Sequence, residues 1–333
     1  MNIMVFDVPA ESGGALTILN EYYNNAVRDN DRNKKWYFVV SLANLAETEN
    51  VKILRFPWIK KSWLHRLFFD TFIAPRIVHK YETDKILSLQ NVIISNVNKH
   101  QTLYLHNSLP FINKRFGLLE SPLFWIYQNL IGKKIIESVR KADQVIVQTQ
   151  WMKHACVERA MIPSEKVTVI PPTVNIEIRR YFQPNEEHFR TFFYPASGFK
   201  YKNHSIIVEA ALLLKKQGIN NYKIIFTLLP QENKYIAKLY EQCRKNDLPV
   251  EFIGTISRQQ VFDYYHRSIL LFPSYIETFG LPMLEAKLHH TPVIASDMSF
   301  SHEILDGYER VFFFCPDNPI LLADHMRRKI NDH

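Results

Sequence analysis

The sequence predicts an α/β protein in which two domains each hold a parallel β-sheet covered by helices. Short β-rich segments alternate with helical patterns along the chain, as in parallel sheets whose strands are joined by helical crossovers. The length of 333 residues is more than one compact core usually holds. A hydrophobic fraction of 47% and a charged fraction of 22% are typical of folded globular proteins and argue against disorder.

The first half of the chain, residues 1–175, is expected to form the N-terminal domain. Its strands are expected at 2–8, 35–42, 51–56, 85–89, 102–106, 144–148 and 167–171, and its helices at 15–28, 62–80, 123–139 and 151–160. The same alternation continues in the second half, residues 191–333. Strands are expected there at 191–196, 223–229, 250–254, 269–273, 292–295 and 311–314.

Residues 176–190 join the two halves. This stretch is polar, contains Pro184 and Asn185 and has no clear period, which predicts an interdomain linker. Two Rossmann-like domains are therefore expected to face each other across a cleft. Ligands of open parallel sheets bind beyond the carboxyl ends of the strands, so the chemistry is expected in that cleft.

Composition argues against several classes of protein. No stretch reaches the roughly 18 uninterrupted apolar residues of a membrane span, and the N-terminus lacks the pattern of a signal peptide, so the chain is expected in the cytosol. Cys156, Cys243 and Cys315 are isolated and odd in number, which predicts reduced core residues rather than disulfides or a zinc site. No Asp-x-Asp motif stands near a strand end, and neither a metal ion nor another cofactor is expected.

Basic charge is concentrated in residues 55–81, which hold six basic residues against one acidic residue, or +5 of the net +8. Leu64, Phe68 and Phe72 recur every four residues as one apolar helical face. Aromatic residues interleaved with Lys and Arg are typical of a helix in the headgroup region of an anionic bilayer. The alternative is that the aromatic residues fill a core and the basic residues form a solvated face. The residues expected to dock on a membrane or an acceptor are Trp58, Lys60, Lys61, Trp63 and Arg66.

Gly13 and Gly14 are adjacent in a chain that has only nine glycines. They follow the first expected strand and open the next helix, an arrangement in which backbone amides can approach a phosphate. The pattern is not GxGxxG and does not indicate a dinucleotide site. A plain strand-to-helix turn is an equal alternative.

The most informative segment is 275–286, in which Glu277 and Glu285 are separated by seven residues. Pro282 suits the first turn of a helix and Gly280 the turn before it, which places Glu277 in a loop and Glu285 about one turn into the helix. The first backbone amides of this helix are then expected to point at an anion, between two carboxylates that accept hydrogen bonds from hydroxyls. A polyhydroxylated phosphate ester fits this arrangement. An acidic loop before an amphipathic helix would explain each glutamate alone, but not the whole phrase.

The segment from Glu277 to Glu285 resembles the E-x7-E motif of retaining glycosyltransferases with the GT-B fold. The phrase E-T-F-G-L-P at 277–282 is particularly similar to family 4 of that classification, the glycosyl transferases group 1, of the bacterial surface-polysaccharide type. Further resemblances lie along most of the chain, in A-D-Q-V-I-V at 142–147, K-V-T-V-I-P at 166–171, K-N-H at 202–204 and F-I-G at 252–254.

The resemblance implies a role for each matching residue. Lys202 would neutralise the diphosphate of a nucleotide sugar, Glu277 would bind hydroxyls of the transferred sugar, and Glu285 would bind the nucleotide ribose. His106 and Glu277 are the implied catalytic residues, with His106 positioning the donor sugar rather than acting as a base. The implied donor-binding residues are Gly13, Gly14, Lys200, Lys202, Thr278, Phe279, Gly280, Leu281 and Glu285.

Two positions depart from the family pattern. The arginine that usually stands five residues before the lysine is replaced by Ser197, and Lys200 is the cation expected to supply the missing charge. The usual I-P-N-G-V phrase reads I-P-P-T-V at 170–174. Both changes affect the expected details of phosphate binding and leave the site itself in place.

The implied activity is the transfer of a sugar, with retention and without a metal ion, from a nucleotide diphosphate sugar to a saccharide acceptor. The acceptor is expected to be lipid-linked, on the inner face of the cytoplasmic membrane, in the synthesis of O-antigen, capsule or another bacterial surface polysaccharide. A nucleotide-sugar epimerase and a non-catalytic nucleotide-sugar-binding or partner subunit remain alternatives, the latter because of Ser197. No nucleic-acid partner is expected, because the basic residues cluster in one aromatic-rich segment without a recognition motif.

Overall fold

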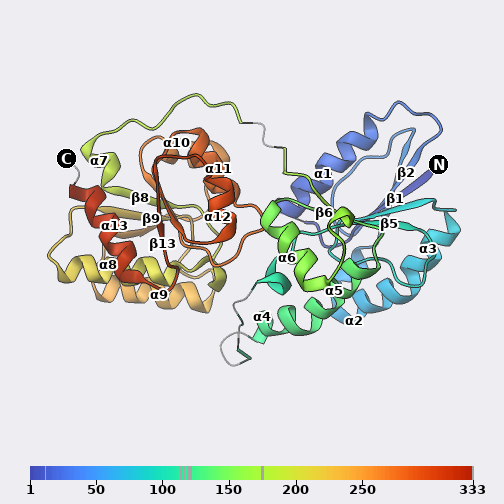
Figure 1. Cartoon of the computed structure of the whole chain (residues 1–333), viewed down its shortest axis with the longest axis horizontal. Coiled ribbons are helices and arrows are strands. Elements are labelled where there is room, and N and C mark those ends of the chain that lie inside the picture. The colour runs from blue at the N-terminus through green and yellow to red at the C-terminus, as the bar shows by residue number, and fades with distance from the viewer. Residues whose placement is uncertain (12, 113–114, 116, 119–121, 174–175, 332–333) are drawn as a thin grey trace. The chain divides into compact units, whose positions relative to one another are not determined.

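The computed structural model describes residues 1–11, 13–112, 115, 117, 118, 122–173 and 176–331. The chain divides into two compact units, Met1–Thr173 and Val174–His333, called unit 1 and unit 2 below (Figure 1). Each unit is a parallel sheet with helices on both faces, as the alternation of elements predicts.

Unit 1 holds a seven-stranded parallel sheet in the order β3-β2-β1-β4-β5-β6-β7. Its strands are β1 (Asn2–Asp7), β2 (Lys35–Val40), β3 (Val51–Arg55), β4 (Lys85–Ser88), β5 (His100–Tyr104), β6 (Gln144–Val147) and β7 (Val167–Val169). Its helices are α1 (Gly13–Val27), α2 (Trp63–Phe68), α3 (Ala74–Lys80), α4 (Pro122–Ile126), α5 (Gly132–Lys141) and α6 (Gln150–Ala160). Every strand was expected within a few residues of its position.

The side chains of the unit 1 strands alternate between two apolar layers. On one face Phe38 packs with Ile18 of α1. On the other face Phe6 packs with Phe69, and Val145 packs with residues of α5 and α6. Burial on both faces explains why these strands are almost continuously apolar.

The helix expected at 62–80 is interrupted by a wider turn. The segment is α-helical in α2, π-helical at Phe69–Ile73 and α-helical again in α3. A second π-helical turn at Tyr127–Ile131 joins α4 to α5. Asp70 of the first π turn lies 3.8 Å from the Nζ of Lys134 in α5, so the two helical segments lie next to each other, as Figure 1 also shows.

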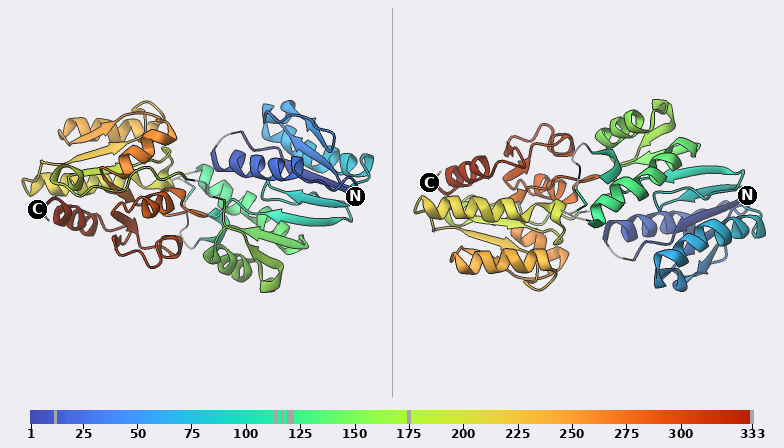
Figure 2. Two further views of the ribbon diagram at one scale, coloured as in Figure 1. Left: turned by 90° about the horizontal axis from the view of Figure 1, so that it is seen from above. Right: turned by 90° about the horizontal axis from the view of Figure 1, so that it is seen from below.

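Unit 2 holds a six-stranded parallel sheet in the order β10-β9-β8-β11-β12-β13. Its strands are β8 (Thr191–Tyr194), β9 (Lys223–Phe226), β10 (Val250–Phe252), β11 (Ile269–Phe272), β12 (Val293–Ser296) and β13 (Val311–Phe314). Its helices are α7 (Glu186–Phe189), α8 (His204–Lys216), α9 (Lys234–Lys245), α10 (Arg258–Tyr265), α11 (Leu281–Leu288), α12 (Ser299–Ile304) and α13 (Pro319–Asn331). The long helices α8 and α13 lie against each other, as the views in Figure 2 show.

The whole of the expected linker, 176–190, lies in unit 2. Its residues Glu186–Phe189 form the short helix α7, whose start is capped by Asn185. The backbone N–H of Phe182 donates to the carbonyl of His289, and that of Gln183 donates to the carbonyl of His266. These backbone bonds hold the segment against unit 2. The segment has no periodic pattern, and for that reason its sequence indicates only a connection.

The strand order of each sheet reverses at one point. In unit 1 the reversal lies between β1 and β4, and in unit 2 it lies between β8 and β11. At such a point the loops leave the two central strands toward opposite faces, which opens a crevice at the carboxyl edge of the sheet. These two edges are therefore the places to look for a site.

The cysteines divide between core and surface. Cys156 and Cys243 are buried, and burial raises the pKa of each thiol to about 12. Cys315 is exposed, so the prediction that it is a core residue is wrong. In the part of the chain that the structure describes, no helix combines the length and the hydrophobicity needed to cross a bilayer.

Candidate functional site

An ion pair between Lys202 and Glu277 lies at the carboxyl edge of the unit 2 sheet. Lys202 follows β8 and Glu277 follows β11, the two strands at which the strand order reverses. The Lys202 Nζ lies 2.5 Å from a carboxylate oxygen of Glu277, and the two side chains are 16% and 14% exposed. Burial lowers the pKa of Lys202, but the attraction of Glu277 and Tyr201 outweighs it and leaves that pKa above its ordinary value.

Two hydrogen-bonded side chains hold the loops that carry this pair. The Tyr194 hydroxyl, fully buried, donates to the carbonyl of Lys202 at 2.9 Å and lies 2.9 Å from the hydroxyl of Ser274. Asn203 adopts a left-handed conformation with φ of 58°, and its amide donates to the carbonyls of Pro273 and Pro316. These bonds hold the backbone carbonyl of Lys202 and the side chain of the residue that follows it.

The helix after Glu277 begins where its sequence predicts. Gly280 has a φ of +92°, a backbone conformation that residues with a Cβ rarely adopt, so the turn favours glycine. Helix α11 starts at Leu281 with Pro282 in its first turn. Glu277 therefore lies in the loop and Glu285 lies inside the helix, as expected.

Glu285 is held by α10, a contact that the sequence did not indicate. An Nη atom of Arg258 lies 3.2 Å from one carboxylate oxygen of Glu285, and the buried hydroxyl of Tyr265 donates to the other at 3.1 Å. Glu285 is only 8% exposed, and burial raises the pKa of its carboxyl. Arg258 stands four residues after the F-I-G phrase, and no motif links that position to Glu285.

The remaining predicted donor residues lie on the same two loops. Lys200 and Ser197 are exposed in the loop after β8, and Thr278 is half-buried in the loop after β11. Phe279 is 8% exposed and lies at the entry to α11. The structure thus places the predicted residues of unit 2 on one edge of one sheet, and their roles remain predictions.

His204 stands next to Lys202 as a second basic residue, but burial lowers its pKa to about 3, so the ring is neutral. It lies between the rings of Tyr194 and Phe226. Lys202 is therefore the charged member of the K-N-H phrase.

The predicted residues of unit 1 lie at the carboxyl edge of its own sheet. Gly13, with φ of +61°, and Gly14 form the start of α1. His106 lies two residues after β5, its ring is tilted against the Tyr104 ring with 4.6 Å between the ring centroids, and its backbone N–H donates to the Asn91 side chain. Burial lowers the pKa of His106 to about 4, so the ring is neutral at pH 7, which fits a positioning role rather than that of an acid.

The basic, aromatic segment 55–81 divides between core and surface. Phe69 is fully buried and Trp58 is half-buried. Lys60 pairs with Glu11 at 2.7 Å. Within this segment, five large apolar side chains are at least 45% exposed, namely those of Trp63, Leu64, Leu67, Phe68 and Phe72. The expected apolar face of the helix is thus open to solvent.

Comparison with known proteins identifies the fold and relates unit 2 to a known family. Residues 176–333 match the family described as glycosyl transferases group 1. This match covers nearly all of unit 2. It is 26% identical over 278 residues to the O-antigen chain mannosyltransferase RfbU of Salmonella typhimurium, an alignment that covers 82% of this chain and 71% of that protein.

A further relative and a solved structure are also similar to the chain. The processive diacylglycerol alpha-glucosyltransferase of Acholeplasma laidlawii is 22% identical over 280 residues, which are 76% of this chain and 80% of that protein. The crystal structure of Anabaena HepE in complex with UDP and glucose superposes with a TM-score of 0.68 at 17% identity, and the match covers 100% of this chain and 90% of that one. The expected GT-B fold class is confirmed.

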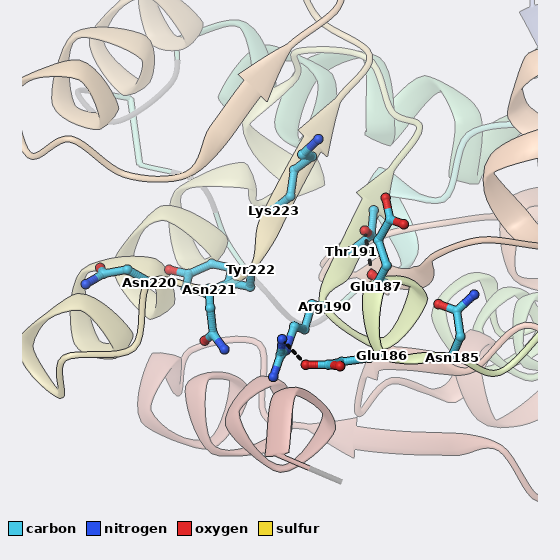
Figure 3. Close-up of a pocket in the computed structure, with 9 residues that line it drawn as sticks. All are labelled: Asn185, Glu186, Glu187, Arg190, Thr191, Asn220, Asn221, Tyr222 and Lys223. Atoms are coloured by element: carbon cyan, nitrogen blue, oxygen red, sulfur yellow. Dashed lines mark hydrogen bonds and ion pairs between the residues drawn. The ribbon is translucent and has the colours of Figure 1, made fainter. Parts of the chain in front are cut away.

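Two hollows of this glycosyltransferase lie away from the predicted donor site. One, of about 650 Å³, is formed where β8 and β9 begin, and its walls include the Arg190–Glu186 ion pair (Figure 3). It lies at the amino edge of the sheet, opposite the edge that carries Lys202. The other is lined by side chains that include Arg180, Asp263 and His289. Among the described residues no three His, Cys, Asp or Glu side chains gather as a possible metal site.

Asp7 is a buried acidic residue that no motif in the sequence marks. It ends β1, is 1% exposed and accepts a hydrogen bond from the backbone N–H of Ala10. Burial raises its pKa to about 8, although the charges of Lys60 and Arg66 act in the opposite direction. The available signal was a single acidic residue at the end of an apolar strand, next to Gly13 and Gly14.

We predict that Asp7→Asn raises the melting temperature at pH 7.5 and leaves it unchanged at pH 4. The folded-state pKa of about 8 lies above the ordinary value of 3.8, so the folded state holds the proton more tightly. The free energy of unfolding therefore falls as the pH rises from about 4 to about 8. Asparagine removes this loss, and each kcal/mol regained raises the melting temperature by about 2–4 °C.

Thermal unfolding of both proteins from pH 4 to pH 8.5 measures this difference. Equal melting temperatures at every pH would show that Asp7 is ionised in the folded protein.

Proposed function

We propose that this glycosyltransferase transfers a sugar, with retention and without a metal ion, from a nucleoside diphosphate sugar to a lipid-linked saccharide of a bacterial surface polysaccharide. The observation that carries the proposal is the Lys202–Glu277 pair at the reversal point of the unit 2 sheet. It combines a cation for a leaving diphosphate with a carboxylate for sugar hydroxyls.

The electrostatics of the site suit a leaving group that gains negative charge. As the glycosidic bond breaks, charge develops on the diphosphate, and the ammonium of Lys202 and the first amides of α11 are the groups in unit 2 that stabilise it. A fixed cation and a helix start can take the part that a divalent ion has in other sugar transferases. Glu285 accepts hydrogen bonds from the ribose hydroxyls, with its carboxylate oriented by Arg258 and Tyr265.

The acceptor class rests on the relatives and on the surface of unit 1. RfbU is named for the O-antigen chain, and the Acholeplasma enzyme is named for diacylglycerol. A lipid-linked acceptor presents its sugar at the membrane surface. The exposed apolar side chains of α2 and the adjoining π turn, next to the basic residues of 55–81, suit shallow insertion into the anionic inner face of the cytoplasmic membrane.

Thermal shift with UDP, GDP, dTDP and their sugar conjugates tests the donor site, because a ligand that binds only the folded state raises its apparent stability. Lys202→Met and Glu285→Gln are expected to weaken nucleotide-sugar binding at least 10-fold. Glu277→Gln and His106→Ala are expected to lower turnover about 100-fold and to change affinity less, because they act on the transferred sugar.

The matched control is Lys215→Met, which removes a lysine of the same unit that is paired with Asp247. It is expected to bind and turn over as the wild type does. Wild-type affinity and turnover in all four site variants would refute the assignment. Nucleotide binding without any turnover would favour a non-catalytic relative, and a β-anomeric product detected by NMR from an α-anomeric donor would exclude retention.

Sedimentation with phosphatidylglycerol vesicles tests the membrane proposal. Neutralising Lys60, Lys61 and Arg66 together with glutamine is expected to weaken binding on the order of 100-fold, since each basic residue near an anionic surface contributes about 1 kcal/mol. Trp63→Ser is expected to weaken it as well by removing inserted apolar area. Ile320→Ser, which removes an apolar side chain that is 70% exposed in unit 2, is the control.

The control variant is expected to bind as the wild type does, and phosphatidylcholine vesicles are expected to bind little of any protein. Equal sedimentation of the wild type and the triple variant with phosphatidylglycerol would rule out electrostatic docking through this segment.

A further inference from the structure

The loop after β8 and the loop after β11 are bonded to each other residue by residue. The carbonyl of Tyr201 accepts from the backbone N–H of Tyr275 at 2.9 Å. The side-chain amide of Asn203 donates to the carbonyl of Pro273 at 3.3 Å. These contacts pair 201 with 275 and 203 with 273, so they follow opposite directions along the two loops. Lys202 lies between the two bonds.

Tyr194 makes the middle connection of this series. Its hydroxyl donates to the carbonyl of Lys202 at 2.9 Å, and it therefore accepts from the hydroxyl of Ser274, which is also 2.9 Å away. Burial raises the pKa of Tyr194 well above its ordinary value, so the hydroxyl keeps the proton that it donates. The carbonyl of Ser274 in turn accepts from the hydroxyl of Ser296, at the end of β12, at 2.7 Å. A buried chain of hydrogen bonds thus joins the backbone of Lys202 to the ends of β11 and β12.

The ammonium of Lys202 is held by a ring as well as by the carboxylate of Glu277. Its Nζ lies over the face of the Tyr201 ring, 5.4 Å from the ring centre. An ammonium is attracted to the negative face of an aromatic ring, and the attraction grows where water is largely excluded. The ring of Phe199 stacks on that of Tyr201, with 5.5 Å between the centroids and 9° between the planes. Lys202 is therefore held at its backbone by Tyr194 and at its ammonium by Tyr201.

We propose that Tyr194 and Tyr201 are positioning residues that hold the ammonium of Lys202 in place for the diphosphate of the nucleotide sugar. The inference deepens the proposed function and rests on it, because that function assigns the diphosphate to Lys202. The neighbouring ring of His204 is neutral, so the placement of one ammonium is decisive in this phrase. A cation stabilises the charge that develops on a leaving group without further reorganisation only if it is already in place.

Two other tyrosines of unit 2 make the same kinds of contact away from the site. Tyr222 is buried, and its hydroxyl donates to the carbonyl of Ala211 in α8 at 3.3 Å. Tyr240 of α9 is half-buried, and the guanidinium of Arg244 lies over its ring, 6.0 Å from the ring centre. Tyr222 is thus the matched control for a buried hydroxyl, and Tyr240 is the matched control for a ring beneath a cation.

Calorimetric titration of the full chain tests the positioning role. UDP, GDP and dTDP are compared with their nucleosides, which measures the affinity that the diphosphate adds. Tyr194→Phe, which removes only the hydroxyl, and Tyr201→Leu, which removes the ring, are each expected to reduce this gain about 5-fold. Tyr201→Phe keeps the ring and is expected to restore the gain to within two-fold of the wild type.

Combination with Lys202→Met separates positioning from a general loss of stability. In this background Tyr194→Phe and Tyr201→Leu are expected to cause no further loss, because their effect passes through the ammonium that is already absent. Tyr222→Phe and Tyr240→Leu remove comparable contacts elsewhere. They are expected to lower the melting temperature and to leave the gain from the diphosphate unchanged.

A wild-type gain in both Tyr194→Phe and Tyr201→Leu, or a further loss of the same size in the Lys202→Met background, would overturn the positioning role. Failure of the proposed function has a different signature. In that case no nucleoside diphosphate binds to the wild-type protein, or Lys202→Met binds it as the wild type does, and the inference fails with the function on which it rests.

Discussion

The ion pair between Lys202 and Glu277 is the interaction on which the candidate site of unit 2 depends. Its two residues are 75 positions apart in the chain, and they meet because β8 and β11 are neighbours in a parallel sheet. Further contacts support the pair. Tyr194 and Asn203 hold the loop that carries Lys202, and the left-handed turn at Gly280 ends the loop that carries Glu277. Separation of this pair would leave a buried charge on each side without a partner, which is costly enough to keep both loops in place.

The two sheets use their reversal points differently. In unit 2 the charged groups at that edge are paired, because Lys202 bonds Glu277 and Glu285 is held by α10, although both ring nitrogens of the neutral His204 lack partners among the described residues. In unit 1 Asp7 and Gln90, at the corresponding edge, keep polar atoms without partners among the described residues. The two edges therefore differ in charge: the unit 2 edge carries a compensated ion pair, and the unit 1 edge carries a buried carboxyl and a buried amide with unbonded atoms.

The sequence predicts the fold well because buried parallel strands are short apolar runs and the helices between them carry a clear period. It also predicts the loop and helix around Glu277, where Gly280 and Pro282 restrict the backbone. It does not predict Arg258 as a partner of Glu285, because an exposed arginine at a helix start has no pattern that names its contact. The same holds for Gln90, whose unbonded amide is a property of its surroundings and not of its spacing. Helix α7 was missed because four residues are too few to show a period.

The pairing of Lys202 with Glu277 has a consequence for how the site responds to its ligand. Both groups lost most of their water when the chain folded, since only 16% and 14% of their side-chain surface remains exposed. The dehydration of these charges was therefore completed in advance and is not repeated in each catalytic cycle. In the proposed reaction, an incoming donor meets dipoles that are already oriented, so little solvent has to reorganise as the bond to the sugar breaks. The free energy needed to remove water from this pair is therefore part of the folding of unit 2, and it is not needed again when the donor of the proposed reaction binds.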